Sequence, residues 1–541
     1  MTGPPAPAAT ASPWLSGRPS NPSNPSNPSN PSNPSNPSNP SKIPLAAILA
    51  LATVLRLAIA AGVGFLTGDD VEVLEAAFSS STGLAFHAWN IRNLLVPRLL
   101  ISPLLGLAGA AGVDDPFWLV RIAALPFVAL TTFNGWLVFL VARRLTDRGT
   151  AVLAAGIFSF HWLPLAYGGT VYPRTVSTTC ILLAALLLTG EGRYTARGCG
   201  AGALVAVAFA DRYSEAVFLA PLALFAWRGG AGRSRAARLG AAAGIGLGFG
   251  LGAVLTAGLG DLALWGKPFA SLAAFARYTL WEGRSSSQTP HQPPLWYLAR
   301  FYAWLPPPAL PFLLLLRRRA GLALPWLGAA LPLLPLSLVH HKELRYLQGS
   351  VPFLAILLAA GAAAMWRRGW RRSTAALLAL SLLLSLNTAR AVIGRKSYAA
   401  VAAARALRGT PEVRTVALSQ AWAYGARLFF ARDVTVLDLS TPPLPGEIAA
   451  ALPRADAVCV FAADLAPAPA IARAIGRAGL VAAGELHRWY SKPVVCFLRR
   501  RAGSAQRVAH GLAHGVGAEG HGGAEEGDRG HQRGVGRGAF R

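Results

Sequence analysis

Apolar stretches of about 20 residues recur along most of this chain, and they constrain its fold more than any other feature. A hydrocarbon core about 30 Å thick needs roughly 20 residues of helix, and only helices or closed barrels satisfy all their backbone hydrogen bonds there. With 53% hydrophobic residues, 14% charged residues and a mean hydropathy of +0.41, the chain is too apolar for a soluble multidomain protein. We therefore predict an α-helical polytopic membrane protein with about eleven transmembrane helices. They run near residues 43–66, 117–141, 149–167, 170–190, 199–212, 213–227, 239–260, 296–316, 320–339, 349–366 and 374–390.

The formal net charge of +27 would suggest a nucleic-acid partner in a soluble protein, but most arginines lie in short loops between apolar segments. Such residues orient transmembrane helices, because Lys and Arg accumulate on the cytoplasmic side. The basic clusters are Arg143-Arg144, Arg193 with Arg197, Arg228–Arg238, Arg317-Arg318-Arg319, and Arg367-Arg368 with Arg371-Arg372. With a cytoplasmic N-terminus all of them fall inside, provided that residues 94–112, which contain Pro97 and Pro103, form a juxtamembrane or re-entrant helix. The expected partner of these charges is therefore the lipid bilayer, and no nucleic acid is expected.

The two ends of the chain differ in composition from its middle. Residues 1–41 end in Asn-Pro-Ser repeats that begin at Asn21, and residues 501–541 are rich in Gly, His and Arg. Neither composition can bury a core, so we predict a disordered leader and a disordered tail. The histidines of the tail lack a fixed ligand spacing, and no metal site is expected. Between these ends we predict a transmembrane domain over residues 42–392 and a small extracytoplasmic domain over residues 393–500.

Residues 393–500 alternate short apolar stretches with helical ones, which predicts a small α/β domain on the outer side of the membrane. Strands are expected at Val413–Leu418, Val434–Leu437, Ala457–Phe461 and Val494–Leu498, and helices at Ala399–Leu407 and Ala468–Arg477. Because the region lacks a Gly-rich phosphate loop, a structural cap is the favoured role and acceptor binding is the alternative. Cys459 and Cys496 could pair outside the cytoplasm, but two ordinary buried thiols are the favoured interpretation.

The predicted orientation gathers polar sequence on the outer face. The three outer loops are residues 67–93, 261–295 and 340–348. Arg121, Arg174 and the group Asp211-Arg212-Glu215 lie near the outer ends of predicted spans. Since charges within spans usually face a cavity or a partner, we interpret this layer as the floor of an outward-opening polar cleft. The alternative is that these residues pair between helices and hold the bundle together, and Arg56 in the first span is interpreted as structural.

Carboxylates cluster directly after the first span, where Asp69 and Asp70 precede Glu72 and Glu75. Clustering raises the proton affinity of a carboxylate, and a positioned carboxylate can take the proton of an attacking hydroxyl. Adjacent side chains on a helix diverge by about 100°, so at most one of the pair is expected to be a general base, and Asp69 is favoured over Asp70. The alternative is that these acids cap a following helix, which is the favoured role of Glu72 and Glu75.

The run His340-His341-Lys342-Glu343-Leu344-Arg345-Tyr346 places several ionisable side chains between two apolar stretches. One such charge inside hydrocarbon costs roughly 3 kcal/mol. A loop at the membrane surface, next to something anionic, is therefore the favoured interpretation.

The first and second outer loops add further candidates. Arg92 precedes the non-crossing helix, and Lys267 is one of only five lysines in the chain. Trp281 and Glu282 lie among Gly and Ser residues, a setting that suits a platform for a sugar ring. An aromatic anchor at the lipid headgroups is an equally good interpretation of Trp281.

Together these motifs resemble glycosyltransferase family 22, the lipid-linked-sugar mannosyltransferases of N-glycan and GPI-anchor assembly, which belong to the GT-C superfamily. The most specific match is the family's His-Lys-Glu-x-Arg-Phe motif, which reads His341 to Tyr346 here. The other matches are Asp69-Asp70, Ile91-Arg92-Asn93 through Pro97, Arg174-Thr175, Gly266-Lys267 through Glu282-Gly283, and Trp296-Tyr297. The resemblance spans roughly residues 43 to 366 and implies a GT-C-like fold for the transmembrane domain.

Some positions depart from the family pattern. Where the family usually has a His-Pro-Asp-Glu type of opening, this chain reads Thr67-Gly68-Asp69-Asp70, so the resemblance leaves open which acid is the base. Thr178 and Ile181 replace the Asn and Glu that follow the Arg-Thr pair, and acceptor recognition is therefore expected to differ from that of the eukaryotic enzymes. The arginine-rich, lysine-poor composition fits a GC-rich bacterial genome. The expected location is the bacterial inner membrane, with the active site on the extracytoplasmic face.

The resemblance implies an inverting transfer of a sugar, typically mannose, from a polyprenyl-phosphate donor to a hydroxyl of a glycan or glycolipid, without a cofactor. The residues it assigns are Asp69 or Asp70 as the base; His341, Lys342, Arg345, Arg92 and Lys267 for the donor phosphate; and Glu282, Trp281 and Arg174 for substrate. Cationic groups of this kind stabilise the charge that develops on a departing phosphate. The alternatives are another GT-C transferase, moving arabinose or aminoarabinose to an envelope glycan, and a transporter, which more often shows repeated halves.

Overall fold

The structure of this chain is a computed structural model. It describes residues 45–62, 65–82, 91–93, 95–228, 234–282, 292–316, 320–396, 398–430, 434–440, 443–465, 469–486 and 492–499. The predicted leader 1–41, the predicted tail 501–541 and the basic cluster Arg317-Arg318-Arg319 lie outside the described residues. The described residues from Leu45 onward belong to one compact unit.

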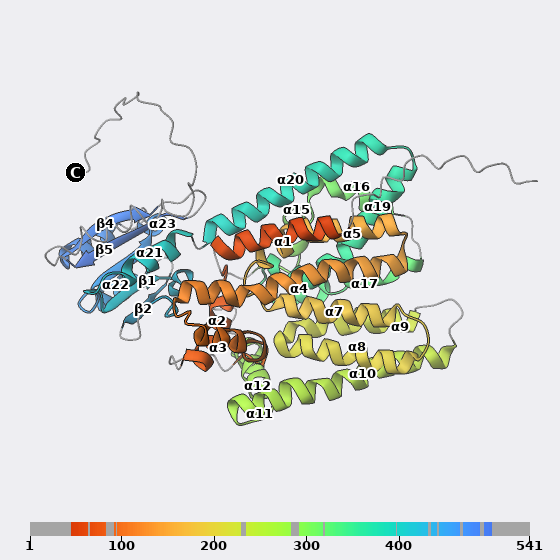
Figure 1. The fold of residues 1–541 in the computed structure, drawn as a ribbon, viewed down its shortest axis with the longest axis horizontal. Coiled ribbons are helices and arrows are strands. Elements are labelled where there is room, and N and C mark those ends of the chain that lie inside the picture. Colours follow the sequence, from red (N-terminus) through yellow and green to blue (C-terminus); the bar gives the residue numbers. More distant parts are fainter. Residues whose placement is uncertain are drawn as a thin grey trace, which may run out of the picture. The chain divides into compact units, whose positions relative to one another are not determined.

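Helices dominate the described chain between Leu45 and Arg408 (Figure 1). Among the described residues, five helical runs are long and apolar enough to cross a membrane. They are α1 (Leu45–Gly62), α4 (Pro116–Leu145), Arg235–Trp265 (α10 Arg235–Ala253 through α11 Leu259–Trp265), Leu344–Arg367 (η7 Leu344–Ser350 and α19 Val351–Arg367), and Arg371–Arg408 (α20 Arg371–Lys396 and α21 Tyr398–Arg408). The predicted helical membrane architecture is confirmed, and the count of eleven spans stays a prediction.

The other described α-helices of this part of the chain do not meet both conditions, since they are too short or, like α8, not apolar enough. They are α2 (Gly68–Thr82), α3 (Ser102–Ala110), α5 (Arg148–Phe160), α6 (Trp162–Tyr167), α7 (Arg174–Leu188), α8 (Tyr194–Asp211), α9 (Leu219–Arg228), α12 (Ala270–Ala276), α14 (Trp296–Ala299), α15 (Phe301–Trp304), α16 (Leu310–Leu314), α17 (Ala323–Ala330) and α18 (Leu333–Leu338). The predicted span 296–316 is divided into four short pieces. Pro306, Pro307 and Pro308 account for the break after α15, because a proline lacks the N–H that a helix interior needs. The apolar helix Arg98–Ala110 is shorter than a bilayer crossing requires, which agrees with the juxtamembrane prediction.

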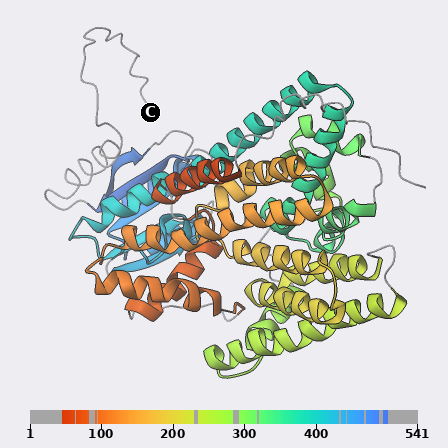
Figure 2. The same ribbon diagram turned by 45° about the vertical axis from the view of Figure 1, so that its right-hand side comes forward.

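Helices α4, α7, α8 and α10 lie side by side in both views (Figures 1 and 2). Glycines set the closest of these contacts. A Cβ at Gly202 would clash with the carbonyl oxygen of Ile245 on α10, and a Cβ at Gly248 would clash with that of Cys199 on α8. Transmembrane helices gain contact area when small residues let their backbones approach, so these glycines explain why α8 and α10 pack so tightly.

Arg56 is fully buried in α1 and binds the break between α5 and α6. Its guanidinium donates to the carbonyl oxygens of Ser159 at 2.9 Å and Pro164 at 3.2 Å. A break in a membrane helix frees carbonyls that need new donors. The role of Arg56 is therefore structural, in agreement with its sequence interpretation.

The C-terminal region carries the β-sheet of the structure (Figure 1). The sheet is mixed and has five strands in the order β2-β1-β3-β5-β4. Its strands are β1 (Thr415–Ser419), β2 (Thr435–Leu439), β3 (Ala457–Phe461), β4 (Leu480–Leu486) and β5 (Val494–Arg499), and its helices include α22 (Pro445–Ala451), α23 (Ala462–Leu465) and α24 (Pro469–Arg477). Strands β2, β1 and β3 are parallel, whereas β5 runs antiparallel to both β3 and β4. The four predicted strands are present. Strand β4 was not predicted from the sequence, because its Ala-Ala-Gly centre lacks the β-branched residues that indicate a strand.

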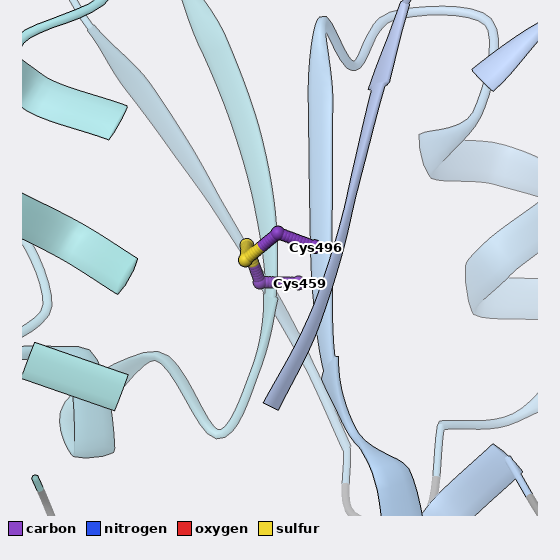
Figure 3. Close-up of a disulfide and its surroundings, with 2 residues drawn as sticks. All are labelled: Cys459 and Cys496. Atoms are coloured by element: carbon purple, nitrogen blue, oxygen red, sulfur yellow. A yellow bond between two sulfur atoms is a disulfide. The ribbon is translucent and has the colours of Figure 1, made fainter. Parts of the chain in front are cut away.

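Cys459 and Cys496 form a disulfide, so the favoured interpretation of two free thiols was wrong (Figure 3). The two cysteines are register partners on the antiparallel strands β3 and β5, with Cα atoms 4.2 Å apart. Their separation of 37 residues gave no hint of this pairing, which strand alignment alone creates. Both sulfurs lie in the buried interior of the sheet.

Replacing both cysteines with alanine should lower the apparent melting temperature of the purified chain. A cross-link that closes a loop of this size restricts the unfolded state, and its loss typically costs about 2–4 kcal/mol. Thermal unfolding in detergent measures the effect, and Cys199→Ala serves as the control because Cys199 is a free cysteine. Equal melting temperatures for the double variant and the control would contradict the prediction.

Candidate active site

Helix α2 begins with a local motif that separates the roles of the two adjacent acids. The carboxylate of Asp70 accepts hydrogen bonds from the backbone N–H of Leu66 at 2.8 Å, the N–H of Thr67 at 3.2 Å and the hydroxyl of Thr67 at 2.7 Å. The Thr67 hydroxyl in turn accepts from the Asp70 N–H at 3.3 Å, which is a capping arrangement. Asp70 is completely buried. Its carboxylate thus holds the turn before α2 in place.

Asp69 points instead into a cluster of arginines from distant parts of the chain. One of its carboxylate oxygens lies 2.7 Å from Arg92, and the other lies 3.4 Å from Arg345 and 3.5 Å from Arg212. Burial raises the pKa of the Asp69 carboxyl, but Arg212, Arg92 and Arg345 outweigh burial and hold that pKa well below its usual range. Asp69 is therefore a carboxylate at neutral pH.

Asp69 and its three arginine partners line a cavity of about 270 Å³. Helix ends build it, because α2, α8, η2 (Tyr213–Phe218), η4 (Arg277–Trp281), α18 and η7 all contribute or flank it. Its lining includes Asp69, Arg92, Asn93, Arg174, Asp211, Arg212, Tyr213, Ser214, Tyr278, Thr279, His341, Arg345 and Tyr346. The volume of the cavity approaches that of small-molecule binding sites, and its lining places charged groups next to aromatic ones.

Arg174 is held rigidly at the wall of this cavity. It forms a buried ion pair with Glu215 and donates to the Ser214 hydroxyl at 2.9 Å. Its guanidinium also lies 4.7 Å from the ring centre of Tyr346, which is a cation–π contact. These three contacts fix the direction of the Arg174 guanidinium. Its remaining N–H groups can donate to a ligand.

Arg212 is a cavity residue that sequence reasoning noted only as part of a polar layer. Its side chain is only 7% exposed, and its Nε atom has no hydrogen-bond partner among the described residues. A buried guanidinium nitrogen without a partner is costly unless a ligand or water completes it. The signal that could have identified it is its position in Asp211-Arg212-Glu215, at the end of a predicted span.

Several predicted site residues lie outside the cavity lining. Lys342 is 2% exposed, and its ammonium donates to the carbonyl oxygens of Val339 at 2.6 Å and Gln292 at 2.9 Å. Lys267 is exposed, the Trp281 side chain is 77% exposed, and Glu282 pairs with Arg277 at 2.7 Å. Of the residues in the basic motif, His341, Arg345 and Tyr346 reach the cavity. Among the described residues, no group of three or more His, Cys, Asp or Glu is arranged to hold a metal ion.

The C-terminal region packs directly against the start of α2. A Cβ at Gly68 would lie 3.6 Å from the Trp422 side chain, and on the neighbouring helix α4 Phe117 stacks on Phe429 with ring centres 4.2 Å apart. Glu75 accepts a hydrogen bond from the Arg427 backbone N–H at 3.4 Å. The segment that carries Asp69 is therefore braced by residues more than 300 positions later in the chain.

This contact predicts a pH-dependent stability. Burial raises the pKa of the Glu75 carboxyl to about 7, although the Arg427 N–H and side chain lower it. The ordinary pKa of a glutamate is 4.5, so the folded chain binds this proton more tightly than the unfolded chain does. The stability that this proton contributes is fully present below about pH 4.5 and is lost as the pH rises to about 7. Glu75→Gln should flatten this dependence and raise the melting temperature above pH 7 by about 1–3 °C. Melting curves between pH 5 and pH 8 test this, with the exposed Glu485→Gln as the control; an unchanged slope would count against it.

The sequence profile of the Alg9-like mannosyltransferase family matches residues 75–411, which is more than half of the chain. The chain belongs to the Alg9-like mannosyltransferase family. It is therefore a glycosyltransferase and an integral membrane protein. A search of curated proteins finds no match.

Solved structures agree with this assignment at the level of the fold. ArnT from Cupriavidus metallidurans, bound to undecaprenyl phosphate, is similar with a TM-score of 0.51 and 11% identity over 84% of this chain and 97% of that one. The apo form of ArnT gives a TM-score of 0.50 and 12% identity over the same shares. The Archaeoglobus fulgidus oligosaccharyltransferase tethered to an acceptor peptide has a TM-score of 0.47 and 11% identity, over 77% of this chain and 69% of that one. The two ArnT matches show that this family member has the fold of the GT-C membrane glycosyltransferases.

Proposed function

We propose that this Alg9-like enzyme transfers mannose from a polyprenyl-phosphate-linked donor to a hydroxyl of a glycan or glycolipid acceptor, with inversion at the sugar. The proposal rests on one observation: the Asp69 carboxylate lies 3.4 Å from Arg345 of the basic motif, and both residues line the same cavity. An acid and cations at one cavity are what this reaction needs, because it removes a proton from the acceptor and places charge on a departing phosphate.

The donor phosphate is assigned to Arg345 and Arg212. Their contacts to Asp69, at 3.4 and 3.5 Å, are longer than the 2.7 Å contact of Arg92, so Arg92 can hold Asp69 when the other two bind a ligand. Arg345 also pairs with Glu343 through its Nε, which fixes the guanidinium, while its Nη1 has no hydrogen-bond partner among the described residues and can donate to a phosphate. A guanidinium offers five donors in a planar fork that matches phosphate oxygens. ArnT, whose fold is similar, binds undecaprenyl phosphate, and this supports a lipid phosphate as the ligand of these arginines. Lys342 is left out of this assignment, because its ammonium already donates hydrogen bonds to two backbone carbonyl oxygens.

Asp69 is assigned as the general base. It takes the proton of the acceptor hydroxyl as that oxygen forms a bond to the anomeric carbon, and the bond from that carbon to the phosphate oxygen breaks. The electron pair of the broken bond leaves with the polyprenyl phosphate, where Arg345 and Arg212 stabilise it. When these arginines turn to the phosphate, Asp69 loses part of their positive field, so its proton affinity rises when a base is needed.

The reaction is placed on the extracytoplasmic face of a bacterial inner membrane. Disulfides persist outside the cytosol, and the Cys459–Cys496 bond lies in the same hydrophobic core as residues of α2, the helix that carries Asp69. The opposite ends of α4 and α19 carry Arg143-Arg144 and Arg367-Arg368, in line with a cytoplasmic location for that side.

Purified chain supplied with polyprenyl-phosphate sugars tests the proposal. We expect transfer from the mannose-linked lipid and weaker or no transfer from the arabinose-linked and aminoarabinose-linked lipids, measured by mass spectrometry of a mixed glycolipid acceptor pool. GDP-mannose without lipid is the control. Transfer from GDP-mannose alone, or from the arabinose lipids in preference to mannose, would overturn the proposal.

A further inference from the structure

A second cavity, of about 470 Å³, lies at the far end of α19 from the active-site cavity. The run Leu344–Arg367 begins with Arg345 and Tyr346 at the first cavity and ends with Arg367 at the second. Since this run is long and apolar enough to cross a membrane, the two cavities open towards opposite faces of it. The second cavity therefore belongs to a different leaflet and takes no part in the transfer reaction.

The lining of this cavity is divided into a charged part and an apolar part. The charged and polar members are Thr146, Asp147, Thr150, Arg367 and Arg368, and the apolar members are Leu145, Leu315, Leu316, Leu322, Ala360 and Ala364. The polar members come from the point where α4 ends, α5 begins and α19 ends. A site with this division fits a ligand that is itself charged at one end and apolar at the other.

The charge at the polar end can be redirected. Arg367 lies 3.4 Å from Asp147, but their side chains are 51% and 60% exposed, and exposed ion pairs hold their partners weakly. Asp147 is satisfied without Arg367, because its carboxylate accepts from the Thr150 N–H at 2.9 Å and from the Thr150 hydroxyl at 2.8 Å. Arg367 can therefore turn to an anion while Asp147 stays capped on α5, and Arg368 stands beside it at the cavity.

Neighbouring residues place this end at the depth of lipid headgroups. Trp370 is 51% exposed, and Arg371 lies over the Trp366 ring at 5.9 Å. Tryptophan is enriched at the membrane–water boundary, and basic pockets between transmembrane helices on the cytoplasmic side bind anionic headgroups. The headgroups of anionic membrane lipids are therefore the ligands that this position favours.

We propose that this cavity binds one anionic phospholipid, with its phosphate between Arg367 and Arg368 and an acyl chain along the apolar wall formed by Leu315, Leu316 and Ala364. The inference concerns a site separate from the transfer reaction and does not depend on the proposed sugar or acceptor. Its chemistry, a phosphate ester joined to hydrocarbon, distinguishes it from a site for free phosphate.

The test uses the full chain, purified in detergent and stripped of lipid. Native mass spectrometry and melting curves are recorded with phosphatidylglycerol, with phosphatidylcholine of the same acyl chains, and with inorganic phosphate. We expect one tightly bound phosphatidylglycerol and a higher melting temperature with that lipid alone. Arg367→Gln with Arg368→Gln should weaken its binding by about fivefold for each arginine.

Arg371→Gln with Arg372→Gln is the matched control, because it removes the same charge from α20, outside the cavity lining. Its affinity for phosphatidylglycerol should stay within about twofold of the parent chain. Equal binding of phosphatidylcholine would overturn the proposal, and so would equal stabilisation by inorganic phosphate, which would indicate a free-anion site. An equal loss in the control pair would show that general surface charge, and no defined site, attracts the lipid.

Discussion

Asp69→Asn is expected to lower the rate of sugar transfer by about 1,000-fold, while the affinity for a polyprenyl phosphate stays the same or rises. The amide cannot take the proton of the acceptor hydroxyl, and general-base catalysis is typically worth about 10²–10⁴ in rate. It also removes the negative charge that Arg92, Arg212 and Arg345 share, so these arginines become more attractive to an anionic phosphate. Single-turnover transfer and a lipid-phosphate binding assay measure the two effects separately.

Asp70→Asn is the matched control, since it makes the same chemical change one residue later. The Asp70 carboxylate caps α2 and lies outside the cavity lining, so this variant should lose about 1 kcal/mol or more of stability while its binding of lipid phosphate stays near that of the parent. A folded Asp69→Asn variant that transfers sugar at the parent rate would remove Asp69 from the proposed mechanism. A folded Asp70→Asn variant without transfer, together with an active Asp69→Asn variant, would assign the base to Asp70.

Arg345→Gln is expected to impair both steps, with donor binding about 10–100-fold weaker and turnover reduced by a further 100-fold or more. A hydrogen bond to a charged group is worth about 1.5–3 kcal/mol, which accounts for the loss in binding. The additional loss in turnover follows because charge on the phosphate oxygen grows as the sugar leaves, and a preorganised cation stabilises that growth. Titration of the polyprenyl phosphate gives the first effect, and turnover at saturating donor gives the second.

Lys342→Gln provides the control from the same motif. Its ammonium bridges the carbonyl oxygens of Gln292 and Val339, so the variant should melt at a lower temperature and bind donor as the parent does. Arg345→Lys keeps the charge but loses the planar fork, and it should recover only part of the binding. If Lys342→Gln weakened donor binding more than Arg345→Gln did, Lys342 would be a phosphate ligand, as the family resemblance implied for Lys342 together with Arg345.

Much of the candidate site could be predicted from the sequence, because charged residues in an apolar chain have few places to go. The acid pair, Arg92, Arg174 and the basic motif were identified in this way, and Asp69, Arg92, Arg174, His341 and Arg345 do line one cavity. The sequence favoured Asp69 over Asp70 as the base but left both acids as candidates. Their different environments depend on the backbone direction at the start of α2, where Thr67 holds the Asp70 carboxylate inward as a cap.

The remaining features of the site depend on contacts between distant segments. Arg212 joins Asp69 across more than 140 residues, and Trp422 braces Gly68 across more than 350. The Cys459–Cys496 bond likewise exists because two antiparallel strands come into register, which a spacing of 37 residues does not reveal. Lys267 and Trp281 are exposed and lie outside the cavity lining, so their assignment to a ligand stays a prediction.

Hydropathy and charge by themselves determined that this chain is a helical membrane protein with its polar chemistry at helix ends, because hydrocarbon tolerates neither unpaired backbone nor unpaired charge. They also determined which residue types gather there. Only the tertiary structure decided which acid meets which arginine, since that depends on the direction and register of segments that the chain brings together from hundreds of residues apart.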